Sequence, residues 1–130
     1  MKFIDAKDAP LGRVASYVAK EALKGEEVKV FNCSEAIITG RFEKIKSDFQ
    51  IKRSRVGQSQ KGPKHPATSE KIVKRAIRGM LPNFRVGRGR EAFKKILCYS
   101  STPKEFEEVK KESFAAKKIK ASRIKEFTKK

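Results

Sequence analysis

Four basic side chains recur on one side of the segment 69–80, with a spacing suited to contacting an anion. They are Lys71, Lys74, Arg75 and Arg78. At 100° per residue of an α-helix they fall within an arc of about 100° and extend over about 10 Å of the helix axis. A solvated helix face usually alternates positive and negative charges, whereas this stripe contains no acid of its own. We therefore interpret the stripe as an anion-contacting surface, with a purely solvated face as the alternative.

Further basic side chains flank this segment on both sides. The segment before it contributes Arg53, Arg55, Lys61, Lys64 and His65, and the predicted turn after it, residues 85–90, contributes Arg85, Arg88 and Arg90. Two glycines in that turn would allow the backbone to approach a phosphate closely. Arg13 belongs to an earlier helical segment that also contains Glu21, so anion contact and simple solvation explain it equally well.

The excess of positive charge is large and concentrated in the middle of the chain. The 130 residues carry 33 Lys and Arg against 15 Asp and Glu, a formal charge of +18. Residues 51–95 hold 14 basic and 2 acidic side chains, whereas residues 1–50 hold 9 and 8. Self-repulsion of this kind destabilises a compact fold unless a polyanion neutralises it.

Folded RNA is the polyanion that the pattern favours. Proteins recognise it largely by shape and by contacts to the backbone and 2′-hydroxyls, which suits an irregular basic surface. Because only Phe84 and Phe93 are aromatic in the basic region, we do not expect a stacking platform for single strands.

The sequence offers no recognisable catalytic or metal-binding pattern. Gly57 and Gly62 have the spacing of a phosphate-binding loop, but Pro63 and Lys64 follow where Lys and then Ser or Thr are required. His65 is the only histidine, and no carboxylate lies near it in the sequence to orient it. One histidine and two distant cysteines do not make a zinc site. We expect no enzymatic activity, cofactor, metal or small-molecule substrate.

Targeting signals are also lacking. No apolar run is long enough to span a membrane, and charged residues interrupt the first eight positions before a signal peptide could form. Cys33 and Cys98 lie far apart in apolar runs, which is typical of core thiols in a reducing compartment. We therefore expect a soluble cytoplasmic chain without a membrane partner.

Short apolar runs alternate with amphipathic segments along the chain. Strands are predicted at residues 2–6, 28–32, 36–40 and 96–99. Helices are predicted from residue 11 to a stop at Gly25, over a segment with Phe42, Ile45 and Phe49 on one face, over 69–80 with a stop at Pro82, over 91–95, and from Thr102 onward. The alternation indicates an α/β fold, with helices layered on a parallel or mixed sheet.

Two segments lack this periodicity. Residues 54–68 contain two glycines and two prolines among polar and basic residues, which predicts an extended basic loop; loops of this length in a small domain are usually functional. Residues after Glu112 are rich in lysine with only scattered apolar side chains, and we expect this tail to become ordered only on contact with a partner.

Several short blocks make the sequence recognisable. They are Gly12-Arg13-Val14-Ala15-Ser16, Ile38-Thr39-Gly40, Lys61-Gly62-Pro63-Lys64-His65, Arg78-Gly79-Met80-Leu81-Pro82 and Gly89-Arg90-Glu91-Ala92. Through them, residues 2–106 closely resemble the large-subunit ribosomal protein L13 family in its archaeal and eukaryotic branch. The resemblance implies a three-layer α/β/α domain around a four-stranded, mainly parallel sheet. We place this domain at residues 1–112 and the basic tail at 113–130.

The resemblance also implies a function. It implies a structural protein that binds large-subunit ribosomal RNA beside neighbouring large-subunit ribosomal proteins, supports assembly of the subunit, and has no catalytic site. The family blocks contain Arg13, Arg78, Arg90 and residues 61–65. The other proposed contacts rest on charge geometry.

Two other classes stay open. A DNA-compacting, chromatin-like protein would bind duplex DNA and structured RNA comparably at equal salt. An RNA-modifying enzyme would form a product on ribosomal RNA and would lose this activity when His65 or a single carboxylate is substituted.

Overall fold

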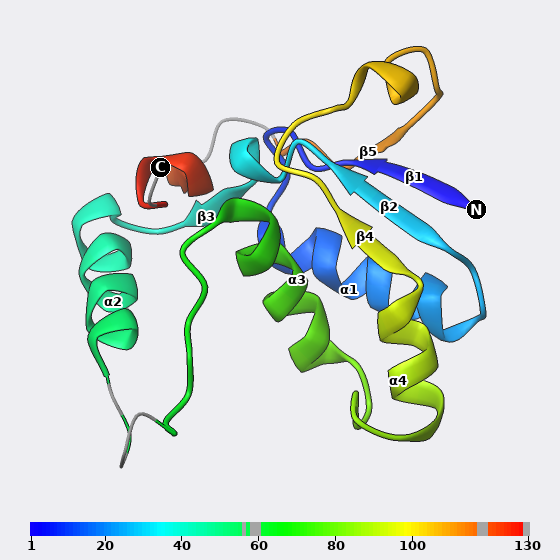
Figure 1. Cartoon of the computed structure of the whole chain (residues 1–130). Coiled ribbons are helices and arrows are strands. Elements are labelled where there is room, and N and C mark those ends of the chain that lie inside the picture. The colour runs from blue at the N-terminus through cyan, green and yellow to red at the C-terminus, as the bar shows by residue number, and fades with distance from the viewer. Residues whose placement is uncertain (56, 58–60, 117–119, 129–130) are drawn as a thin grey trace.

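Four parallel strands form the central sheet, in the order β4-β2-β1-β5 (Figure 1). They are β1 (Lys2–Asp5), β2 (Val28–Phe31), β4 (Ile96–Cys98) and β5 (Glu112–Ser113). This computed structural model describes residues 1–55, 57, 61–116 and 120–128. Side chains alternate between the two faces of a strand, so Val28 and Val30 are buried on one face while Lys29 and Phe31 point to the other.

Three helices cover the first face of the sheet: α1 (Leu11–Leu23), α3 (Ser69–Met80) and α4 (Gly87–Lys94). Their apolar side chains recur every three or four residues and face the sheet. Val14 and Val18 of α1 and Ile77 of α3 are completely buried. The first helix ends just before Gly25, whose φ of 100° is a left-handed conformation that glycine adopts without strain. These elements confirm the predicted helices at residues 11–24 and 69–80.

An aromatic cluster covers the second face of the sheet. The Phe31 ring stacks on Phe3 and Tyr99 with centroid separations of 6.2 and 5.4 Å, and Phe106 lies 5.4 Å from Phe31. Phe106 belongs to the segment that connects β4 with β5. The predicted layered α/β fold is confirmed, with this segment forming the third layer.

The predicted C-terminal helix from Thr102 is wrong. The segment forms only a single 3-10 turn, Lys104–Phe106. Between Phe106 and the start of β5, Val109 is the one apolar side chain, so a longer helix would bury too little surface to offset the cost of helix nucleation.

A second, two-stranded sheet joins the middle of the chain to its C-terminal part. β3 (Ile37–Thr39) pairs antiparallel with β6 (Ala121–Arg123). Ile124 and Phe127 follow β6 and are buried, and the Phe127 ring stacks on Phe49 of α2 (Phe42–Ser54) with centroids 4.7 Å apart.

The expectation that the tail becomes ordered only on contact with a partner is therefore wrong for residues 113–116 and 120–128. Residues 120–128 are anchored by the buried Ile124 and Phe127, and residues 113–116 by the pairing of β5 with β1 and the contact between the Phe114 and Tyr17 rings. Residues 117–119 and 129–130 lie outside the described part, and the domain boundary at residue 112 stays a prediction.

The predicted turn at residues 85–90 is wrong from Gly87 onward, because α4 begins at that residue. Gly89 is buried, and a Cβ there would lie 2.5 Å from the carbonyl oxygens of both Pro82 and Asn83. Glycine is a poor helix former in isolation, but here the missing side chain lets α4 pack directly against the chain that follows α3.

The long basic connection between α2 and α3 has neither helix nor strand at Arg55, Gly57 and residues 61–68, as predicted. Its residues 56 and 58–60 lie outside the described part. Among the described residues, no helix is long and apolar enough to cross a membrane.

Candidate nucleic-acid interface

The basic side of α3 lines a surface groove, which we call the α3 groove. The groove has a volume of about 220 Å³ and is lined by Lys64, Pro66, Lys71, Lys74, Arg75, Arg78 and Phe93. Ile72, Val73 and Ile77 on the opposite flank of the helix are buried in the core. The amphipathic pattern of α3 therefore fixes the basic stripe toward the groove and brings it together with Lys64 of the loop.

Two phenylalanines contact Lys74 and Arg78 of the α3 groove and also Arg85, which lies outside it. The guanidinium of Arg78 lies 4.6 Å from the centroid of Phe84, and that of Arg85 lies 5.5 Å from the same ring. The ammonium of Lys74 lies 5.0 Å from the centroid of Phe93. Cation–π attraction at exposed sites contributes about 0.5–1 kcal/mol, so the rings hold these cations in place. Sequence reasoning missed this role because it depends on where the folded chain places Phe84, in the connection between α3 and α4, and Phe93 of α4.

A hydrogen bond fixes the loop against α3. Nη1 of Arg75 donates to the carbonyl oxygen of Lys64 at 2.7 Å. The loop and the helix thus meet at the groove that both of them line.

The cations of the α3 groove are not neutralised by acids of the described chain. The ion pairs within residues 1–55, 57, 61–116 and 120–128 involve the N-terminus, Lys2, Lys24 and Arg123, and none involves a predicted contact residue. Glu70 is the only acid on α3, and it accepts a hydrogen bond from the Ser100 hydroxyl, which lowers the pKa of its carboxyl. The groove therefore keeps a net positive charge that a polyanion would neutralise.

Arg53 and Arg55, two further predicted contact residues, line a second cavity. It has a volume of about 400 Å³ and is lined by Arg53, Arg55, Gly57, Gly62, Pro63, Lys64 and His65. Nη1 of Arg53 donates to the carbonyl oxygen of Phe127 at 2.8 Å, while its Nε and Nη2 are buried without a hydrogen-bond partner in the described part of the chain. The C-terminal segment therefore helps to place a basic side chain of the proposed interface.

Other predicted contact residues lie outside these two cavities. Nη2 of Arg88 donates to the carbonyl oxygen of Leu23 at 3.2 Å, which gives this arginine a structural role at the C-terminal end of α1. Arg13, Lys61 and Arg90 are exposed, and the structure does not bring them to either cavity.

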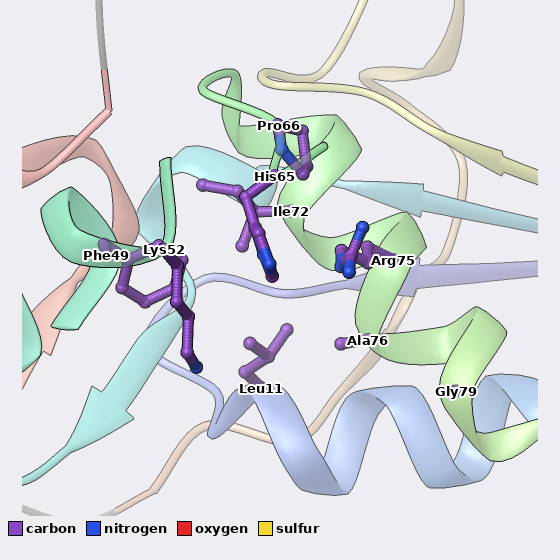
Figure 2. Close-up of a pocket in the computed structure, with 9 residues that line it drawn as sticks. All are labelled: Leu11, Phe49, Lys52, His65, Pro66, Ile72, Arg75, Ala76 and Gly79. Atoms are coloured by element: carbon purple, nitrogen blue, oxygen red, sulfur yellow. The ribbon is translucent and has the colours of Figure 1, made fainter. Parts of the chain in front are cut away.

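A third cavity, which sequence reasoning missed, lies between α2 and α3 (Figure 2). This α2–α3 pocket has a volume of about 260 Å³ and is lined by Leu11, Phe49, Lys52, His65, Pro66, Ile72, Arg75, Ala76 and Gly79. Lys52 was not among the predicted contacts. Its spacing of three residues from Phe49 places both side chains on one face of a helix. Lys52 could have been predicted from this spacing.

The imidazole of His65 stands in a positively charged environment. Its burial, together with the charges of Arg75, Lys52 and Arg55, lowers the pKa of His65 below the ordinary 6.5. The side chain is therefore neutral at neutral pH, with one ring nitrogen that donates and one that accepts a hydrogen bond.

The described residues contain no group of three or more His, Cys, Asp or Glu side chains that could hold a metal ion. Cys33 is buried, Cys98 is half-buried, and both are free thiols.

Comparison with known proteins identifies the family of this chain. The profile of the family described as Ribosomal protein L13 matches residues 1–105. "Large ribosomal subunit protein uL13" of Methanopyrus kandleri is 49% identical over 105 residues, which cover 81% of this chain and 65% of the relative. The proteins of the same name from Natronomonas pharaonis and Thermoplasma acidophilum are 47% and 42% identical, covering 82% and 86% of this chain and 72% and 81% of the relatives. With a family match over most of its length and these levels of identity, the chain belongs to the ribosomal protein L13 family.

Proposed function

We propose that this chain is a structural constituent of the large ribosomal subunit that binds large-subunit ribosomal RNA and supports assembly of the particle. The names of its relatives support membership of that subunit. The α3 groove is the observation that carries RNA binding, because lysines and arginines of the loop and of α3 meet there without acidic partners in the described chain.

Binding follows from neutralisation of phosphates by fixed cations. Each phosphate contact releases condensed counterions, so about eight contacts predict a slope of about −6 to −7 for the logarithm of the binding constant against the logarithm of salt concentration. The folded body supplies an irregular basic surface for RNA of matching shape, and neighbouring ribosomal proteins complete the surroundings. No chemical step is part of this function.

The test compares two variants of equal charge. Combined alanine substitution of Lys71, Lys74 and Arg78 removes the groove cations and keeps Arg75, which holds the loop. The control substitutes Lys7, Lys44 and Lys104, which are exposed and lie outside the cavities described. We expect the groove variant to bind large-subunit ribosomal RNA about tenfold or more weakly than the control, with an unchanged far-UV circular dichroism spectrum.

Further outcomes test the role of the groove and decide between the functional classes. Equal binding by both variants at physiological salt would show that the groove is merely solvated. Equal affinity of the wild-type chain for duplex DNA and for ribosomal RNA would favour a chromatin-like protein, and product formation on the RNA would favour an enzyme. Sedimentation of the chain with the large subunit in a gradient of cell extract supports the proposal, and its absence from those fractions contradicts it.

A further inference from the structure

The α2–α3 pocket combines two kinds of surface. Its apolar walls come from Leu11, Phe49, Ile72 and Ala76. Lys52 and Arg75 add positive charges, and Figure 2 shows the His65 side chain between them. A purely apolar ligand would leave the two cations unused, and a free phosphate would leave the walls unused. The lining therefore suits a flat, largely apolar group that is attached to an anion.

The pocket is held in shape by contacts that need no ligand. One side of the Phe49 ring is stacked against Phe127. The loop segment that supplies His65 is fixed by the hydrogen bond from Arg75 to the Lys64 carbonyl. The same loop segment supplies Pro66, and helices α1, α2 and α3 supply the remaining lining residues. Little ordering is required when a ligand enters, which favours binding.

The pocket also adjoins the α3 groove. Arg75 and Pro66 line both cavities. A nucleic-acid strand whose phosphates follow the groove therefore passes the mouth of the pocket.

We propose that the α2–α3 pocket receives one base of large-subunit ribosomal RNA, turned out of its stack, while Lys52 and Arg75 contact the neighbouring phosphates. This inference rests on the proposed function and names a subsite of it. Bases in loops and bulges of RNA are commonly splayed out, stacked on aromatic side chains and hydrogen-bonded at their edges. Phe49 supplies an aromatic surface and His65 supplies a donor and an acceptor. A volume of about 260 Å³, below the range of about 300–1,000 Å³ for drug-sized ligands, suits a single base.

The first experiment fills the pocket without changing the charge. Ala76→Leu adds an apolar side chain inside it, and Ala115→Leu makes the same change at an exposed alanine outside it. The full chain is titrated with large-subunit ribosomal RNA, and the reactivity of every base is mapped by chemical probing. We expect Ala76→Leu to weaken binding by about tenfold, the effect of losing one stacked base, and to expose one base that the wild-type chain shields. Ala115→Leu should behave like the wild type.

The second experiment removes one cation from the pocket. Lys52→Ala should weaken binding severalfold and should also expose the shielded base, whereas Lys44→Ala, an exposed position on the same helix, should do neither. If the circular dichroism spectrum shows that Ala76→Leu does not fold, this pair of variants decides the question.

The failures of the two proposals are distinguishable. If the wild-type chain does not prefer ribosomal RNA, the proposed function fails. If it binds the RNA with the groove dependence described above, but the pocket variants bind equally well and shield the same bases, the pocket proposal alone is overturned. It is equally overturned if no base is shielded in the two-component complex and Ala76→Leu only prevents incorporation into particles, because the occupant is then a neighbouring protein.

Discussion

The guanidinium of Arg75 donates a hydrogen bond of 2.7 Å to the carbonyl oxygen of Lys64, eleven residues earlier in the chain. The same side chain lines both the α3 groove and the α2–α3 pocket. Arg75 therefore combines two tasks that are usually separate, since it holds the basic loop in position and also presents a charge to the proposed RNA.

Substitution of Arg75 should consequently weaken RNA binding by more than the loss of one positive charge explains. We expect Arg75→Ala to increase amide hydrogen exchange in residues 61–67 and to weaken RNA binding more than Lys71→Ala, which removes an exposed cation of the same stripe. Exchange measured by mass spectrometry and titration with ribosomal RNA check both parts. If both variants lose RNA affinity equally and Arg75→Ala leaves exchange in the loop unchanged, the hydrogen bond does not position the loop.

His65 should titrate below its ordinary pKa of 6.5, because burial and the charges of Arg75, Lys52 and Arg55 disfavour the imidazolium. As the pH falls below about 6.5, the unfolded chain takes up the proton first, so the free energy of unfolding should decrease until the folded pKa is passed. NMR titration of this single histidine measures the pKa directly. Arg75→Ala should raise it toward 6.5, and a wild-type value at or above 6.5 would contradict the described environment.

Phe127 should contribute strongly to stability although it lies close to the end of the described residues. It is 5% exposed and stacks on Phe49, so Phe127→Ala should lower the free energy of unfolding by about 3 kcal/mol. Phe42→Ala is the control, because Phe42 is 39% exposed and its loss should cost under about 1 kcal/mol. Urea unfolding of both variants makes the comparison. Similar losses would mean that the C-terminal segment does not anchor α2.

Two glycine substitutions should have opposite effects. Gly89→Ala places a Cβ 2.5 Å from two backbone carbonyl oxygens and should destabilise the fold by about 1–3 kcal/mol through overpacking. Gly12→Ala in α1 meets no described atom within 4 Å, so it should leave stability unchanged or raise it by up to about 1 kcal/mol through better helix propensity. Thermal unfolding of the two variants provides the measurement, and a stable Gly89→Ala protein would contradict the close packing of α4.

Elements whose burial follows a local period could be predicted from the sequence. The helix Ser69–Met80 has the predicted bounds, because its apolar flank repeats every three to four residues and Pro82 cannot continue it. The strand around Val28 and Val30 was equally clear, since a short run of β-branched side chains is typical of a buried strand.

Elements that depend on distant contacts could not be predicted. The start of α4 depends on Gly89 fitting against the backbone of Pro82 and Asn83, and propensity alone disfavours a helix there. The pairing of β6 with β3 joins residues more than 80 positions apart in the chain, and the lysine-rich composition around Ile124 gives no indication of it.

The candidate site divides in the same way. The stripe of α3 was predictable, because its members are three or four residues apart on one helix. The α2–α3 pocket was not, because Leu11, Phe49 and His65 come from separate segments and meet only in the folded chain. The contacts of Arg78 with Phe84 and of Lys74 with Phe93 likewise depend on the path of the folded chain after α3.

The pairing of β3 with β6 has a consequence for biosynthesis. A growing polypeptide completes β3 and α2 long before it reaches β6 and Phe127, so the apolar side of Phe49 stays uncovered throughout most of translation. The parallel sheet can be completed as soon as β5 has been synthesised, whereas β3 and α2 remain without their partners until β6 and Phe127 follow. A nascent chain that stops before residue 121 would leave β3 unpaired and the Phe49 ring uncovered. We expect chaperones to bind this exposed surface.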